Sequence, residues 1–151
     1  MRFFAVTCLA ALLLMAALSR AELIGEHKDP RAAVLEMAAH YYSTQEVARQ
    51  CGALLPEKRS MFDSAWTTWQ TRNAATWELI GKVRDKRLGK SDRQQLGQLA
   101  DTIRQQYATA PFDASMCETA LKMLRSQAWD FPVKFPAQLA LLKRANDTAS
   151  H

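Results

Sequence analysis

The side chains of this sequence that could carry out acid–base or metal chemistry are few and far apart. Glu36 and His40 stand four residues apart, a spacing that places a carboxylate and an imidazole on one face of a helix. A catalytic or metal site needs further members, and the other two histidines, His27 and His151, lie near the ends of the chain. The sequence contains no short motif of metalloproteases, serine hydrolases, phosphate-binding loops or haem attachment sites. It therefore predicts no catalytic residue, no metal site and no cofactor.

A second group of candidates lies in residues 61–80, which hold three of the four tryptophans. On a helical wheel, five large apolar residues of this segment share one narrow face: Phe62, Trp66, Trp69, Trp77 and Ile80. Such a face predicts a long helix whose tryptophans belong to the core. One polar residue, Asn73, falls in the middle of that face, and Arg72 lies at its edge.

The side-chain amide of Asn73 allows two interpretations. In the first, Asn73 is buried and binds a neighbouring helix, which fixes the register of packing, because an unpaired buried amide costs about 1 to 3 kcal/mol. In the second, Asn73 is a polar anchor in an aromatic cleft and orients a ligand or the backbone of a partner. The planar guanidinium of Arg72 is expected to cover Trp69.

Two further stretches combine residue types that proteins use for recognition. Residues 129–136 hold the aromatic residues Trp129, Phe131 and Phe135 and two prolines, and they predict either a cap over the open end of a bundle or a recognition surface. Six basic residues lie in the range Lys82 to Arg93. They predict either a solvated helix terminus or a site for anionic lipid, a cell-wall polymer or an acidic partner.

The first 21 residues predict a cleaved signal peptide. Arg2 supplies a positive start, residues 3–18 form an uncharged apolar run, and Ser19 and Ala21 are small residues at the two positions that a signal peptidase reads. An uncleaved anchor is disfavoured, because sixteen residues rise only about 24 Å as a helix and the hydrocarbon core is roughly 30 Å thick. The remaining 130 residues carry a net charge of +3, which is too mild to indicate nucleic-acid binding.

Two cysteines remain after the predicted cleavage, Cys51 and Cys117. An even number of cysteines in an exported chain predicts a disulfide. Each cysteine lies on the apolar face of its own predicted helix, so packing of these faces can bring the two Cα atoms within the roughly 4.4 to 6.8 Å that the bond requires. The spacing contains no C-x-x-C, which disfavours disulfide exchange and a four-cysteine zinc site.

The helices that must position these residues are marked by capping signals and by apolar positions at helical spacing. Start signals occur in chain order at Pro30, Ser43, Glu57, Ser91, Ser115 and Ala137. The long helix that begins at Glu57 is expected to end at Leu88, with Gly89 in a left-handed conformation after it. No segment alternates between apolar and polar residues over the length of a strand.

The sequence thus predicts an all-α, single-domain bundle of five to six helices with one disulfide. The predicted organisation is a signal peptide at 1–21, a helical bundle at 22–145 and a disordered tail at 146–151. The expected function is that of a periplasmic or secreted protein that binds a protein partner in the cell envelope, as an inhibitor, an immunity-type protein or an envelope accessory protein. The alternative is a carrier that holds an amphiphilic small molecule between its helices. The candidate binding residues are Trp66, Trp69, Arg72, Asn73, Trp77, Trp129 and Phe131.

Overall fold

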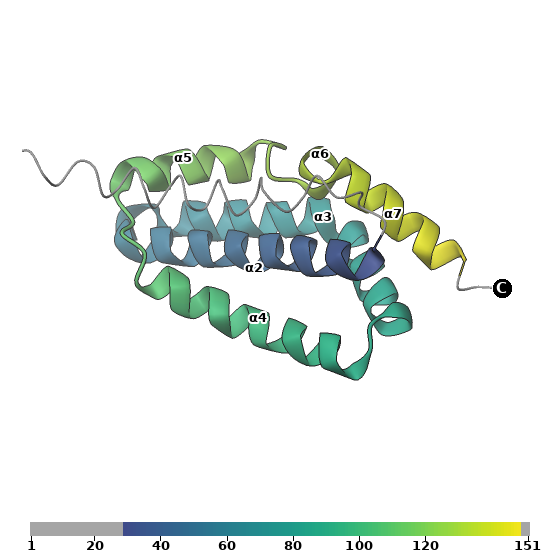
Figure 1. Cartoon of the computed structure of the whole chain (residues 1–151). Helices are drawn as coiled ribbons and strands as arrows, with labels where there is room; N and C mark the ends of the chain where they lie inside the picture. Colours follow the sequence, from purple (N-terminus) through teal and green to yellow (C-terminus); the bar gives the residue numbers. More distant parts are fainter. Residues whose placement is uncertain (1–28, 149–151) are drawn as a thin grey trace, which may run out of the picture.

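The computed structural model describes residues 29–148, which form helices joined by short connections and contain no strand (Figure 1). The elements are α2 (Pro30–Leu54), the 3-10 turn η1 (Pro56–Lys58), α3 (Arg59–Arg87), α4 (Lys90–Ala108), α5 (Ala114–Arg125), α6 (Phe131–Lys134) and α7 (Pro136–Asp147). The predicted all-α bundle of five to six helices is confirmed. The predicted signal peptide and residues 149–151 of the predicted tail lie outside the described residues.

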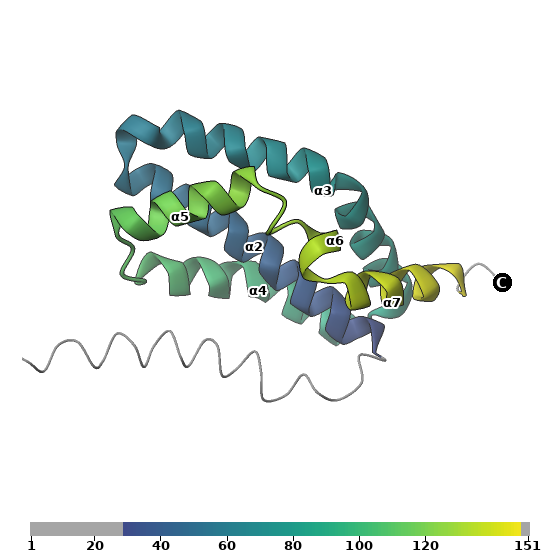
Figure 2. The ribbon, with the colours of Figure 1, turned by 90° about the horizontal axis from the view of Figure 1, so that it is seen from above.

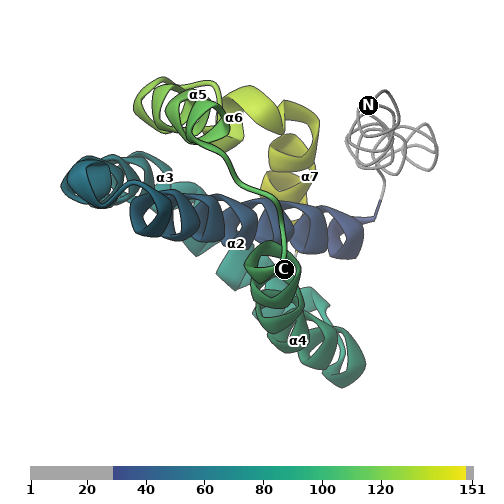
Figure 3. The same cartoon turned by 90° about the vertical axis from the view of Figure 1, so that its left-hand side faces the viewer.

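The long helices α2 and α3 run antiparallel and form the centre of the bundle (Figure 2). Helices α5, α6 and α7 cover one side of this pair, and α4 lies on the other side (Figure 3). Helix α4 packs against α2 and hardly contacts α3. The α4 side of α3 is therefore left without a covering helix in the described part of the chain. No helix within residues 29–148 is both long enough and apolar enough to cross a bilayer.

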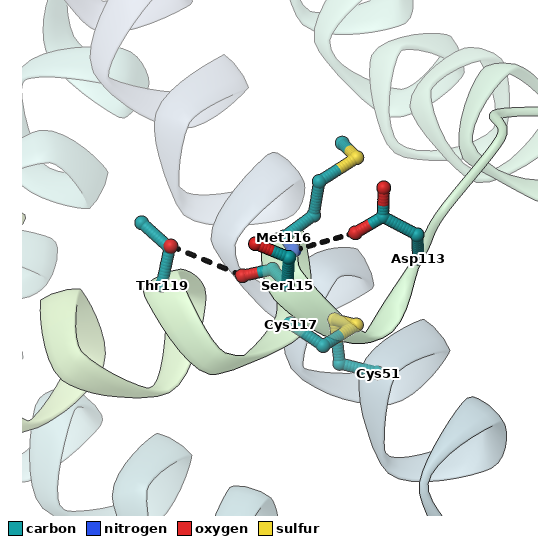
Figure 4. Close-up of a disulfide and its surroundings, with 6 residues drawn as sticks. All are labelled: Cys51, Asp113, Ser115, Met116, Cys117 and Thr119. Carbon is teal, nitrogen blue, oxygen red and sulfur yellow. Dashed lines mark hydrogen bonds between the residues drawn. A yellow bond between two sulfur atoms is a disulfide. The ribbon is translucent and has the colours of Figure 1, made fainter.

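The core lies mainly between the α2–α3 pair and the helices α5 to α7. Its largest fully buried side chains include Met37, Phe62, Trp69, Leu124, Phe131 and Leu142. The predicted disulfide is confirmed and joins Cys51 of α2 to Cys117 of α5, with 5.3 Å between the two Cα atoms (Figure 4). Both cysteines are fully buried.

The predicted helix start at Ser43 is wrong, because α2 continues through it without a break. The side chain of Thr44 donates its hydroxyl hydrogen to the carbonyl of His40, one turn earlier in the same helix, at 2.7 Å. Glu46, the residue expected to close a capping box, is buried instead and forms ion pairs with Arg49 and with Arg104 of α4. A long-range contact with α4 thus takes the place of the predicted local cap.

The connection between α3 and α4 also differs from the prediction. Gly89 is not left-handed: its φ is −69° and its ψ is 174°, and it serves as the N-cap of α4. Its N–H group donates to the carboxylate of Asp92 at 3.2 Å. Similarly, α5 begins before Ser115, because the carboxylate of Asp113 accepts the N–H of Met116 at 2.7 Å. In both places a carboxylate, rather than the predicted serine, binds a backbone N–H at the helix start: that of the N-cap Gly89 in α4 and that of Met116 in the first turn of α5.

The last predicted boundaries need smaller corrections. Residues 129–136 contain the four-residue helix α6 rather than a simple turn. Helix α7 extends to Asp147, two residues beyond the predicted end of the bundle. Asn146 and Asp147 are therefore helical rather than part of a tail.

Candidate functional site

The structure separates the seven candidate residues into two groups. Five of them meet in a network that fastens α6 to α3: Trp69, Arg72, Asn73, Trp129 and Phe131. The other two, Trp66 and Trp77, are half-buried and contact tyrosines of α2. The predicted burial of the three tryptophans of α3 is therefore complete only for Trp69, which has no exposed surface.

Asn73 is used entirely within the chain. It is 1% exposed, and its side-chain nitrogen donates to the carbonyl of Trp69 at 2.8 Å and to the carboxylate of Asp130 at 3.1 Å. Its side-chain oxygen accepts the N–H of Phe131, the first residue of α6, at 2.8 Å. This N–H has no partner within α6, as at every helix start. The geometry therefore favours the interpretation of Asn73 as an internal tie between α3 and α6.

Arg72 binds Asp130 rather than covering Trp69. Its Nε and Nη2 atoms donate to the two carboxylate oxygens of Asp130 at 2.8 and 2.9 Å, a bidentate arrangement. Nη2 also donates to the carbonyls of Leu124 and Ser126 at the end of α5, both at 2.9 Å. The hydrogen bond to Asp130 raises the pKa of Arg72 above its ordinary value. This guanidinium thus joins α3, α5 and α6.

Sequence reasoning missed Asp130, although a local signal was present. Asp130 directly precedes Phe131 and Pro132, and an aspartate followed by a proline in the first helical turn is a typical helix start. The same segment supplies the carbonyl of Trp129, which accepts the indole N–H of Trp69 at 3.1 Å.

His40 contacts the same carbonyl of Trp129 through Nε2 at 2.8 Å, and since a carbonyl only accepts, Nε2 carries the hydrogen. Burial, together with the positive charge of Lys134, lowers the pKa of His40 to about 4, despite the opposing effect of this hydrogen bond. Glu36, its predicted neighbour, binds Gln138 of α7 instead. Within residues 29–148 no three His, Cys, Asp or Glu side chains are grouped so that they could hold a metal ion.

We expect the neutral state of His40 to make the fold sensitive to acid. The folded pKa of about 4 lies below the ordinary value of 6.5, so the unfolded chain takes up the proton first. The contribution of neutral His40 to the free energy of unfolding is therefore complete above pH 6.5. It decreases as the pH falls, and about 3 kcal/mol of it is lost at pH 4. Urea unfolding at a series of pH values measures the free energy of unfolding of the native chain and of His40→Gln. Glutamine keeps a hydrogen-bond donor at this position but does not titrate. Equal slopes of stability against pH from 6.5 to 4 in both proteins would contradict the expectation.

On the other side of the central pair, half-buried aromatic residues form a continuous row. We call Trp66, Tyr41, Trp77 and Tyr42 the aromatic row. Tyr41 stacks on Trp77 with ring centroids 3.9 Å apart and contacts Trp66 edge-on at 5.3 Å, while Tyr42 contacts Trp77 edge-on at 6.0 Å. Gln70 donates to the hydroxyl of Tyr41 at 2.9 Å. The row therefore has a fixed geometry and keeps part of each ring exposed.

The aromatic row ends at an open cleft of about 300 Å³ between α2, α3 and α4, which we call the α3–α4 cleft. It is lined by Tyr42, Arg84, Asp85, Arg93, Leu96 and Gly97. Arg84 binds the carboxylate of Asp85 at 2.7 Å. The guanidinium of Arg93 is exposed and forms no hydrogen bond or ion pair within the described residues. Arg84 is thus paired directly with Asp85, whereas Arg93 acts on Asp85 only through its charge and forms no hydrogen bond with it.

The cleft also clarifies the predicted basic cluster in the range Lys82 to Arg93. Four of its six members have partners within the chain: Lys82 with Glu78, Arg84 with Asp85, Lys86 with Asn146, and Arg87 with the carbonyl of Ala145. Arg87 therefore complements the last turn of α7 rather than that of its own helix. Lys90 and Arg93 are left without such a partner in the described part of the chain, and both lie in the first turn of α4.

A second cleft, of about 190 Å³, lies between the start of α3 and α5. Its lining includes Lys58 and Glu118, which bind each other at 2.8 Å. No aromatic side chain is among its lining residues. The aromatic row with the α3–α4 cleft is the stronger candidate for a binding site. Comparison with protein-family models, curated proteins and solved structures gave no match for this chain, so this geometry is the basis for a functional interpretation.

Proposed function

We propose that this protein acts by binding a protein partner in the cell envelope, and that the aromatic row and the α3–α4 cleft form its binding surface. The observation that carries the proposal is a row of half-buried aromatic rings that leads to an exposed arginine without a hydrogen bond, on a side of α3 that no helix within residues 29–148 covers. Tyrosine, tryptophan and arginine are the residue types that dominate the binding energy of protein interfaces.

The ordering of this surface also supports binding. The rings of Tyr41 and Trp77 are stacked, and Gln70 fixes the hydroxyl of Tyr41. A surface that is already ordered loses little side-chain freedom when a partner binds, which favours affinity. The buried disulfide supports a periplasmic or secreted location, because disulfides persist in oxidising compartments.

The alternative, an amphiphilic small molecule carried between the helices, has less support. Trp69 and Asn73, which were expected to hold such a molecule, are fully packed and make their hydrogen bonds within the chain. The α3–α4 cleft is open, and its volume lies at the lower end of the roughly 300 to 1,000 Å³ of ligand pockets. An open surface of this kind suits a segment of a protein better than a small molecule, which binds in a more enclosed pocket.

Photo-cross-linking in intact cells tests the proposal. Ala74 is exposed and lies one turn from both Gln70 and Trp77, on the same face of α3. With p-benzoylphenylalanine at Ala74 of the full chain, we expect irradiation to give one discrete adduct with another protein. The same probe at Val133 of α6, which is 57% exposed on the opposite side of the central pair, should not give it.

Each outcome of this experiment decides between the interpretations. No adduct from Ala74, or the same adduct from both positions, would contradict a protein-binding surface at the aromatic row. An adduct whose added mass corresponds to a lipid or another small amphiphile would favour the carrier instead.

A further inference from the structure

Two glycines at or near the α3–α4 cleft have no role in the packing of the described chain: Gly97 lines the cleft, and Gly81 lies one turn before Arg84 of its lining. Gly81 lies inside α3 and Gly97 inside α4, and neither has a positive φ. A Cβ atom added at Gly97 would meet nothing within 4 Å, and one added at Gly81 would meet only the guanidinium of Arg84, at 4.0 Å. Glycine is among the least favourable residues in a helix interior. Its presence at both positions therefore has no explanation inside the bundle.

Gly52, by contrast, lies against other side chains of the bundle, although an added Cβ would make only ordinary van der Waals contacts with them. It is buried where α2 meets α3, and an added Cβ would lie 3.7 Å from both Phe62 and Arg59. At Gly81 and Gly97, by contrast, the position that a Cβ atom would take is open. A glycine at such a position lets the backbone of another molecule approach closely.

The free charge of the cleft is positive. Lys90 and Arg93 stand three residues apart in α4, and Gly97 follows Arg93 by four, so all three share one edge of the helix. The carboxylate of the cleft, Asp85, is bound directly by Arg84, and Arg93 acts on it only through its charge, so the hydrogen-bond donors of Arg93 can still bind an anion. A guanidinium binds a carboxylate strongly and in a defined geometry.

The dimensions of the surface define the shape of what it can bind. From Trp66 to Arg84 it extends along α3 for about 27 Å, at 1.5 Å per residue. Within residues 29–148 there is no sheet edge to which an extended peptide could add as a strand. A helix of about 18 residues matches this length, and the apolar face of a helix can pack on aromatic rings while its backbone approaches the two glycines.

We infer that the occupant of this surface is an acidic amphipathic helix of the partner protein. The helix packs its apolar face on the aromatic row, passes close to the backbones at Gly81 and Gly97, and pairs a carboxylate with Arg93. This inference rests on the proposed function, since it specifies the partner of the same site.

Two variants in the chain that carries the photo-probe at Ala74 test the inference. Gly97→Leu should leave the melting temperature unchanged or raised, because the space is open and leucine favours helix, yet it should lower the yield of the protein adduct at least tenfold. Arg93→Gln should lower the yield severalfold and reduce its dependence on salt. Arg125→Gln is the matched control, because Arg125 is an exposed arginine of α5, on the other side of the central pair, and has no hydrogen bond or ion pair in the described residues.

Mass spectrometry of the cross-linked peptide identifies the occupant. We expect a segment with apolar residues at helical spacing and with Asp or Glu within one turn of them. A proline-rich peptide, a peptide without acidic residues, a peptide of a second copy of this chain, or an undiminished yield with Gly97→Leu would overturn the inference. Those results leave a protein adduct in place, whereas failure of the proposed function is the absence of any protein adduct from the parent chain.

Discussion

Asp130→Ala should destabilise the fold by about 3 to 5 kcal/mol, the cost of removing one member of a buried ion pair. Asp130 is 6% exposed and accepts hydrogen bonds from Arg72 and from Asn73. Without its carboxylate, the guanidinium of Arg72 keeps only two carbonyl partners, and a buried hydrogen of Asn73 is left unpaired. Denaturant unfolding at pH 7 measures the change as a lower midpoint.

The matched control for this substitution is Asp101→Ala. Asp101 also pairs with an arginine, but its side chain is 70% exposed and that of Arg104 is 60% exposed. Exposed pairs of this kind contribute about 0 to 1 kcal/mol. If both alanine variants lowered the midpoint by the same small amount, the network around Asp130 would not be the fastening between α3 and α6 that its geometry indicates.

Removal of the disulfide should lower the free energy of unfolding by about 4 kcal/mol in the chain-entropy model. The bond closes a loop between residues 66 positions apart. That loop contains η1, α3 and α4, so the unfolded chain gains much freedom when the bond is absent. The double variant Cys51→Ala and Cys117→Ala is preferable to serine, since both sites are fully buried and a hydroxyl there would need a partner.

Two measurements verify this expectation. The double variant should unfold at a lower denaturant concentration than the native chain, and reduction of the native chain should produce a similar shift while leaving the double variant unchanged. Purified protein that is denatured without reductant should show no titratable thiol at Cys51 or Cys117. Two thiols per chain under these conditions would contradict the bond.

Apolar spacing predicted the helical class well, but of the three tryptophans that it predicted to be buried in α3, only one is. Trp69 is buried as expected, whereas Trp66 and Trp77 on the same face are only half-buried. A helical wheel gives the direction of a side chain but not the element that covers it. Here α4 packs on α2 and leaves that part of α3 open, a result of tertiary packing that the spacing does not contain.

The errors in the helix boundaries have a similar origin. Ser43 to Glu46 has the composition of a capping box, but Glu46 pairs with Arg104, 58 residues later, and the helix continues. Asn73 was identified as the anomalous polar residue of its face, but its partner Asp130 lies 57 residues away. Local patterns identify which residues need a partner, and only the fold determines which partner they receive.

Helix α6 has four residues, a length at which a helix does not persist by itself in water. Its first N–H, that of Phe131, is bound by Asn73 of α3, and the carbonyl of Trp129, two residues earlier, is bound by both His40 of α2 and Trp69 of α3. These donors come together only after the α2–α3 hairpin has formed. The formation of α6 is therefore conditional on the packing of α2 against α3, and a substitution that loosens this pair also removes the groups that hold α6.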